Sequence, residues 1–256
     1  MKKFFALLLT AVMVLSLAAC GGNKKMVYAV EAGSAGEAAA IENKFEINSV
    51  DTQAKALMEV QSGTSNAAII DSLMAGAMVG PGTSYPDLKV TDQKLTEELY
   101  GVGCRKGSNL AAYINGVFAE AYAAGTMQEI ATTYGVQEAL VEQTADIIDI
   151  PTDGDVADIV ASGKLVVGIT DFAPMDYKDD NGEWIGFDAD MAKIVADKLG
   201  VEIEFIEIDW DSKIMELDSG NIDVVWNGMT LTDAMLAAME CTNAYCNNAQ
   251  VVVTKG

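Results

Sequence analysis

The sequence predicts an α/β fold of two similar lobes, each a mostly parallel sheet flanked by helices. Two segments, residues 45–71 and 205–227, share one plan: a strand, a polar loop, a helix that ends in Ser-Gly, and a second apolar strand. Strand-helix-strand units of this kind build parallel sheets, and their repetition predicts two lobes. With 256 residues, half of them hydrophobic, the chain is long enough to form two cores.

The N-terminus has the pattern of a secretion signal. Two lysines precede an apolar run that ends in Leu-Ala-Ala-Cys, which resembles a bacterial lipobox. We expect residues 1–19 to be a signal peptide, Cys20 to carry the lipid, and residues 20–23 to be the tether. The expected location is the outer face of the bacterial cytoplasmic membrane, with the lipid as the only membrane contact, since no second apolar run of spanning length follows. A signal peptide with an incidental cysteine is the alternative.

Composition argues against several classes of function. A formal net charge of −22 with 16 Lys and Arg argues against a nucleic-acid partner, which needs clustered basic residues. The absence of histidine removes Ser-His-Asp and Cys-His catalysis and most zinc sites. We therefore expect no enzyme, no cofactor and no metal; acid/base catalysis by cleft carboxylates is the minor alternative. Cys241 and Cys246 could form a disulfide, but buried thiols are favoured.

Residues that follow the predicted strands are the candidate ligand contacts, because α/β sheets bind ligands beyond the carboxyl ends of their strands. The strand at 26–30 leads into a Gly-Ser turn and an Ala/Glu-rich helix, whose N-terminus favours anions. The full set of candidates at strand ends is Glu31, Gly33, Ser34, Asp71, Thr170, Asp171, Phe172, Asp209, Trp210, Asn227, Gly228 and Thr230.

Two segments carry a family resemblance. NGEWIGFDADMAKIVADKLG (181–200) and SGNIDVVWNGMTLT (219–232) closely resemble the first lobe of the polar amino-acid-binding proteins of ABC importers. Segments within residues 27–135 resemble the later portion of the same family. The resemblance implies a type II periplasmic-binding-protein fold that captures an amino acid or related amine between its lobes and delivers it to an ABC permease. The alternative is a receptor of the same fold that senses a cationic amine without transport.

The order of the two blocks departs from that of the family, which predicts a circular permutation. We expect residues 24–98 to form the family's second lobe and residues 99–256 its first. Within the latter, residues 99–135 would be the family's C-terminal part, 136–160 a linker and 161–256 its N-terminal part. We also expect a single covalent crossing near Leu99 and Tyr100, with Gly256 beside Lys24 near the hinge. A truncated tandem gene or a lobe-swapped assembly would explain the same order.

The resemblance also assigns roles to individual residues. Phe172 and Trp210 occupy the positions of an aromatic pair that clasps the ligand side chain. Asp71 would pair with the ligand's α-ammonium group, although it could also cap the helix that follows. The remaining expected hydrogen-bonding positions are Ser34 for the carboxylate, and Thr230 with the backbone of Asn227 and Gly228 for both polar groups.

One position departs from the family pattern. The family usually carries an arginine three residues after the second threonine of TLT, where it binds the ligand's carboxylate; here Met235 stands there. With Glu31, Asp71 and Asp171 nearby, the expected site is acidic. We therefore expect lysine, arginine or an amine without a carboxylate to bind more tightly than glutamate or aspartate, unless a lysine or a helix dipole compensates.

Overall fold

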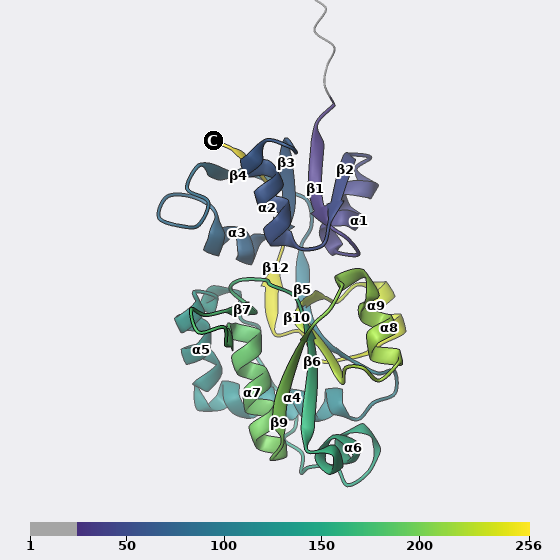
Figure 1. The fold of residues 1–256 in the computed structure, drawn as a ribbon. Coiled ribbons are helices and arrows are strands. Elements are labelled where there is room, and N and C mark those ends of the chain that lie inside the picture. The colour runs from purple at the N-terminus through teal and green to yellow at the C-terminus, as the bar shows by residue number, and fades with distance from the viewer. Residues whose placement is uncertain (1–24) are drawn as a thin grey trace, which may run out of the picture.

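The computed structural model describes residues 25–256 and arranges them in two α/β lobes (Figure 1). The small lobe has a five-stranded sheet with the order β2-β1-β3-β13-β4. Its strands are β1 (Val27–Glu31), β2 (Glu46–Val50), β3 (Ala67–Asp71), β4 (Leu88–Lys94) and β13 (Gln250–Lys255). Its helices are α1 (Ala35–Glu42), α2 (Gln53–Ser62) and α3 (Ser72–Met78). The predicted signal peptide, Cys20 and the tether lie outside the described residues.

The large lobe has a second sheet with the order β11-β5-β10-β6-β9, and β12 also pairs with β5. Its strands are β5 (Glu98–Cys104), β6 (Lys164–Ile169), β9 (Glu202–Glu207), β10 (Val224–Thr230), β11 (Glu240–Cys241) and β12 (Cys246–Asn248), and a separate hairpin pairs β7 (Tyr177–Lys178) with β8 (Trp184–Ile185). Its helices are α4 (Leu110–Ala124), α5 (Thr126–Tyr134), η1 (Gln137–Ala139), α6 (Gly154–Ser162), α7 (Phe187–Leu199), η2 (Trp210–Ser212), α8 (Lys213–Asp218) and α9 (Asp233–Ala238).

The two sheets have the same plan, which confirms the predicted α/β class and the internal repeat. In the small lobe β1 lies between β2 and β3, and all three are parallel. In the large lobe β6 lies between β9 and β10 in the same way. An antiparallel strand lies next to this parallel set in each sheet: β13 pairs with β3 in the small lobe, and β5 pairs with β10 in the large lobe. β3 (AAIID) is buried throughout, as expected of a strand that helices cover on both faces.

The chain crosses between the lobes twice. It passes from β4 to β5 and again from β12 to β13, because β13 pairs with β3 and β4 of the small lobe. The expected range 99–256 for one lobe is therefore wrong for its last strand, and the expected single crossing is wrong. The apolar run at 251–253 is buried and fills the place between two small-lobe strands. Gly256 donates its N–H to Asp87 O (2.9 Å) at the end of the small lobe remote from the large lobe (Figure 1), so its expected place near the hinge is also wrong.

The expected linker 136–160 is partly a packed helix. Between η1 and α6 the backbone is irregular, but α6 begins at Gly154 and buries Val156 and Ile159. Arg105 fixes this helix, since its guanidinium contacts Asp155 (3.1 Å) and Asp223 at the start of β10 (3.2 Å). The only arginine of the chain thus has a structural role.

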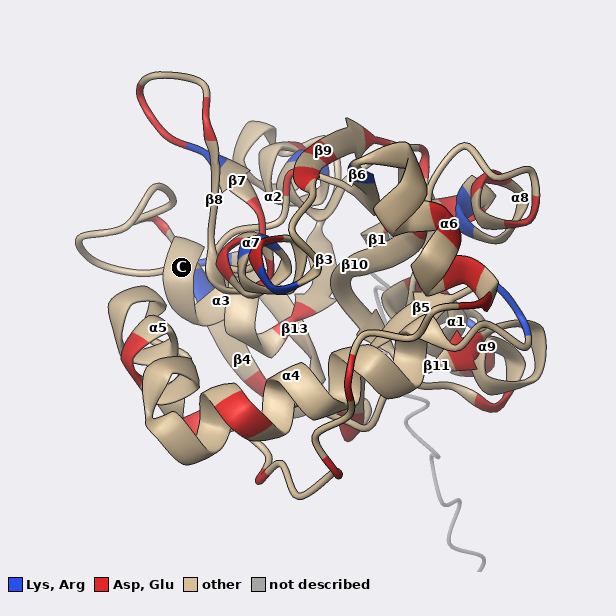
Figure 2. Ribbon diagram, turned by 90° about the horizontal axis from the view of Figure 1, so that it is seen from below, with Lys and Arg blue, Asp and Glu red and all other residues tan. Residues whose placement is uncertain are grey.

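The surface of the protein is acidic, and its described cysteines are free. Acidic residues are spread along the ribbon in the view of Figure 2, with few basic ones among them. Within residues 25–256, no helix has the length and apolar character needed to cross a membrane. Cys104, Cys241 and Cys246 are free thiols, and the predicted buried thiol is confirmed for Cys246, whereas Cys241 is only partly buried.

Candidate functional site

A cavity of about 210 Å³ lies between the lobes, and we call it the central cavity. The small lobe contributes the ends of β1, β3 and β13 and the first turn of α1, whereas the large lobe contributes η2, α8, β10 and α9. The predicted contacts that line it are Glu31, Gly33, Ser34, Asp71, Trp210, Asn227, Gly228 and Thr230, together with Met235. The repeated sheets explain this meeting, because both present the carboxyl ends of their parallel strands to the space between them.

Phe172 does not line the central cavity. Its side chain is buried, and its ring lies edge-on to Tyr100 with 6.5 Å between centroids. It also packs against the backbone of Gly228, where an added Cβ would lie 2.5 Å from Phe172 Cε1. The expected aromatic pair is therefore reduced to Trp210, and Phe172 supports the cavity from behind.

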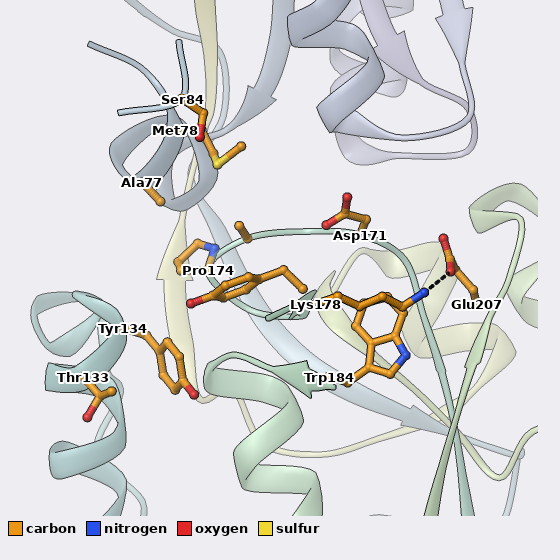
Figure 3. A pocket seen from close by; sticks show the side chains of 12 residues that line it. Ala77, Met78, Ser84, Thr133, Tyr134, Asp171, Pro174, Lys178, Trp184 and Glu207 are labelled. Carbon is orange, nitrogen blue, oxygen red and sulfur yellow. Dashed lines mark hydrogen bonds and ion pairs between the residues drawn. The ribbon is translucent and has the colours of Figure 1, made fainter. Parts of the chain in front are cut away.

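Asp171 lines a different cavity, of about 520 Å³, which also lies between the lobes (Figure 3). Met78 borders this second cavity from the small lobe, and Trp184 borders it from the β7-β8 hairpin. Lys178 lies 4.6 Å from the Trp184 ring centroid and pairs with Glu207 at 3.2 Å. Burial, followed by the charge of Glu207, raises the pKa of Asp171. The sequence placed Asp171 beside Glu31 and Asp71, but the structure separates it from them.

The polar groups of β10 that we expect to contact the ligand already form hydrogen bonds within the protein. Asn227 donates to Thr170 Oγ1 (2.7 Å) and accepts from Thr170 N (2.9 Å). The N–H of Gly228 donates to Asp188 Oδ2 at 2.7 Å. Thr230 Oγ1 donates to Glu98 Oε2 at 3.0 Å. These residues form part of the cavity wall. Their side-chain and amide donors are used in hydrogen bonds that stabilise the fold.

The N-terminus of α1 is also occupied. Ser34 caps the helix by accepting from Glu37 N at 3.1 Å. The carboxylate of Glu37 in turn accepts from Gly33 N at 2.8 Å, so an internal anion already lies at this helix end. A ligand carboxylate at the expected Ser34 position would meet that negative charge.

Asp71 belongs to a buried network beside the two crossings. Its Oδ1 accepts from Tyr100 Oη (2.6 Å), Gln250 Nε2 (3.0 Å) and Asn248 Nδ2, and its Oδ2 accepts from Gln53 Nε2. Its side chain makes no capping bond to α3, so the capping alternative is wrong. Burial, with a smaller contribution from the charge of a neighbouring glutamate, raises the pKa of Asp71 to about 7.

Two buried acceptors that belong to residues of the cavity wall remain without partners. Glu31 Oε1 and Gln250 Oε1 have no hydrogen-bond partner, and their residues are 3% and 1% exposed. Burial, followed by the charge of Asp71, raises the pKa of Glu31 to about 8. A buried acceptor without a partner is costly, and a ligand donor would remove that cost.

The residue that sequence reasoning missed is Lys213, the first residue of α8. It is 5% exposed, and its Nζ donates to Trp210 O and, across the lobes, to Gly33 O, both at 2.9 Å. The ammonium also lies 4.7 Å from the Trp210 ring centroid, within cation–π range. Burial lowers the pKa of Lys213 to about 8, against the opposing charge of Glu31. Its spacing of four from the buried Leu217 was the available signal, since such residues share a helix face.

Comparison with known proteins supports the sequence resemblance. Residues 165–256 match the family of bacterial extracellular solute-binding proteins, family 3. A "probable amino-acid ABC transporter-binding protein" of Haemophilus influenzae is 35% identical over 104 residues, 40% of each chain. The arginine-binding extracellular protein ArtP of Bacillus subtilis is 34% identical over 93 residues, 36% of each chain. The solved structure of an ancestral cationic amino acid solute binding protein is 41% identical, with a TM-score of 0.31, over 32% of this chain and 36% of that one.

The chain thus spans about two fifths of the length of the curated relatives it matches. The matched residues include η2, α8 and β10, which form the large-lobe wall of the central cavity. Over residues 165–256, the comparisons confirm the resemblance to extracellular amino-acid-binding proteins of ABC importers.

Proposed function

We propose that this protein is the substrate-binding component of an ABC importer, which captures an amino acid in the central cavity and delivers it to a membrane permease. The observation that carries this proposal is an interlobe cavity lined by a buried carboxyl group, Glu31, and a buried ammonium, Lys213. Its volume of about 210 Å³ is below the ~300–1,000 Å³ of pockets for drug-sized ligands, which suits a single small metabolite. The two similar relatives are themselves named as binding proteins.

Capture in this proposal uses closure of the lobes about the two crossings, a hinge motion that binding proteins of this architecture can make. The hydrogen bond from Lys213 Nζ to Gly33 O joins one lobe to the other, so it is a contact of the closed arrangement. Opening would break this bond and expose Trp210 to an incoming ligand. The buried Asp71 network, which lies at the crossings, would stay on the hinge side.

We also retain three expectations as proposals. Lipid attachment at Cys20 would keep the protein on the outer face of the membrane, close to the permease. A circular permutation would account for the reversed order of the two family-like blocks. Binding without catalysis is proposed because the named curated relatives are binding proteins.

The direct test is calorimetry of the protein without its first 19 residues against the twenty common amino acids and cystine. We expect saturable binding of at least one of them, together with a smaller radius of gyration in solution scattering when that ligand is added. Glu31→Gln should weaken the binding, whereas Glu42→Gln, an exposed change of equal charge on α1, should not. Absence of binding by every one of these compounds would contradict the proposed function.

A further inference from the structure

Lys213 presents a buried ammonium without a paired anion. Within residues 25–256, no carboxylate oxygen lies within 4.0 Å of its Nζ, and its two acceptors are carbonyls. An ammonium has three N–H donors, of which these carbonyls take two, and Lys213 lines the central cavity. A buried charge without a counter-ion is strongly unfavourable, so this arrangement favours the arrival of an anion.

The other candidate carboxylate partners are unsuitable. Met235 lines the cavity but has no donor. Arg105 is bound to Asp155 and Asp223 away from the cavity. The N-terminus of α1 already holds the carboxylate of Glu37. Lys213 is therefore the cation that remains for an anionic ligand group among the residues that line the central cavity.

We propose that Lys213 binds the carboxylate of the ligand, while Glu31 Oε1 and Gln250 Oε1 accept from its ammonium. The central cavity then contains a cation and a carboxyl group that face the same space without touching each other. A zwitterion would bind both the ammonium of Lys213 and the two acceptors, whereas an amine without a carboxylate would bind only the acceptors. This inference rests on the proposed function and does not change the expected preference for lysine and arginine over glutamate and aspartate.

Closure of the lobes assembles this carboxylate site. Lys213 belongs to the large lobe, and its ammonium is held partly by Gly33 O of the small lobe. Glu31 and Gln250 come from the small lobe, so these acceptors and the ammonium of Lys213 lie on opposite lobes. A zwitterion that bridges them would link the lobes directly, which gives the bound ligand a means to stabilise the closed form.

The test compares amino acids with the amines that lack only the carboxylate: histidine with histamine, arginine with agmatine, and methionine with 3-methylthiopropylamine. Calorimetry on the protein without residues 1–19 would measure both members of each pair. We expect the amino acid that binds to exceed its amine in affinity, and Lys213→Met to reduce this ratio by about 10- to 100-fold, the usual effect of losing a hydrogen bond to a charged group. Lys213→Arg should retain most of the ratio.

Lys55→Met, at an exposed lysine of the small lobe, is the matched control and should leave the ratio unchanged. Thermal unfolding would establish that each variant is folded. An unchanged ratio in a folded Lys213→Met protein would overturn the assignment and leave the proposed function intact. Tighter binding of both members of a pair to that variant would also overturn it, because Lys213 would then be an internal competitor. Failure of every compound to bind the unmodified protein would remove the proposed function and this inference together.

Discussion

Trp210 and Phe172 both follow strands of the large lobe, yet their surroundings differ. Trp210 is 7% exposed and lines the central cavity, where the ammonium of Lys213 lies over its ring. Phe172 is 2% exposed and packs on Tyr100 and the backbone of Gly228. An aromatic side chain at a strand end can thus serve either the ligand or the fold, and the direction of the side chain decides which.

This difference gives a paired prediction. Trp210→Ala should weaken amino-acid binding by about 1–3 kcal/mol, the scale for burying a large apolar side chain, and should also lower the free energy of unfolding, because Trp210 packs in a buried apolar cluster with Leu217 and Met229. Phe172→Ala should lower the free energy of unfolding by about 3–5 kcal/mol, because it leaves a cavity in packed surroundings, and should affect ligand affinity less. Urea denaturation and calorimetry on both variants measure the two effects. Unchanged affinity in a folded Trp210→Ala protein would show that Trp210 serves packing alone.

At the scale of elements, the turn between β1 and α1 contacts η2 of the other lobe. Gly33 has φ of +69°, and a Cβ added there would lie 2.6 Å from Asp211 Cα. This distance is shorter than real Cβ contacts allow, and the obstacle is backbone. Glycine at this turn therefore permits the close approach of the lobes as well as the left-handed conformation.

Gly33→Ala should consequently oppose closure. We expect ligand affinity to fall at least about tenfold, or ~1.4 kcal/mol, because the lobes must stay further apart. Gly82→Ala is the matched control, since Gly82 also has positive φ (+86°) but nothing within 4 Å of an added Cβ. Calorimetry gives the affinities, and solution scattering with ligand gives the shape. Normal affinity in Gly33→Ala with a compact scattering profile would show that this contact does not limit closure.

At the scale of the whole molecule, buried acids connect folding to pH. The pKa of Glu31 is raised to about 8 and that of Asp71 to about 7, mainly by burial. Between the ordinary carboxyl pKa of about 4 and these raised values, the folded protein binds more protons than the unfolded chain. Stability from these groups is therefore present at low pH and is lost as the pH rises through the raised pKa values.

We accordingly expect the free energy of unfolding to fall as the pH rises from about 5 to about 7. Each group contributes a slope of at most about 1.4 kcal/mol per pH unit. Glu31→Gln should make this fall less steep, because one of the titrating groups is removed. Glu42→Gln removes an exposed charge from the end of α1 in the same lobe and is the control. Equal slopes in the two variants, from denaturant titrations at several pH values, would contradict the role of Glu31.

Much of the fold could be predicted from the sequence. The repeated strand-helix-strand segments gave both parallel β-α-β units, because apolar periodicity and Ser-Gly helix ends are local properties. Eight of the twelve candidates at strand ends line the central cavity, which follows from the rule that such sheets bind ligands there. Of the four exceptions, Asp209 directly precedes η2, and Thr170, Asp171 and Phe172 are neighbours in one turn, where the path of a few residues sets the side-chain directions.

The sequence by itself determined the α/β class, the two repeats, the absence of histidine chemistry and the set of residues at strand ends. Only the tertiary structure decided where β13 pairs and what Lys213 does. The strand at 250–255 is apolar and would suit either sheet, so its partner depends on the gap between β3 and β4. Lys213 would be a solvated helix residue in an isolated lobe, and Gly33 O reaches it only from the other lobe. Contacts between distant segments decide both features, and local sequence patterns do not encode those contacts.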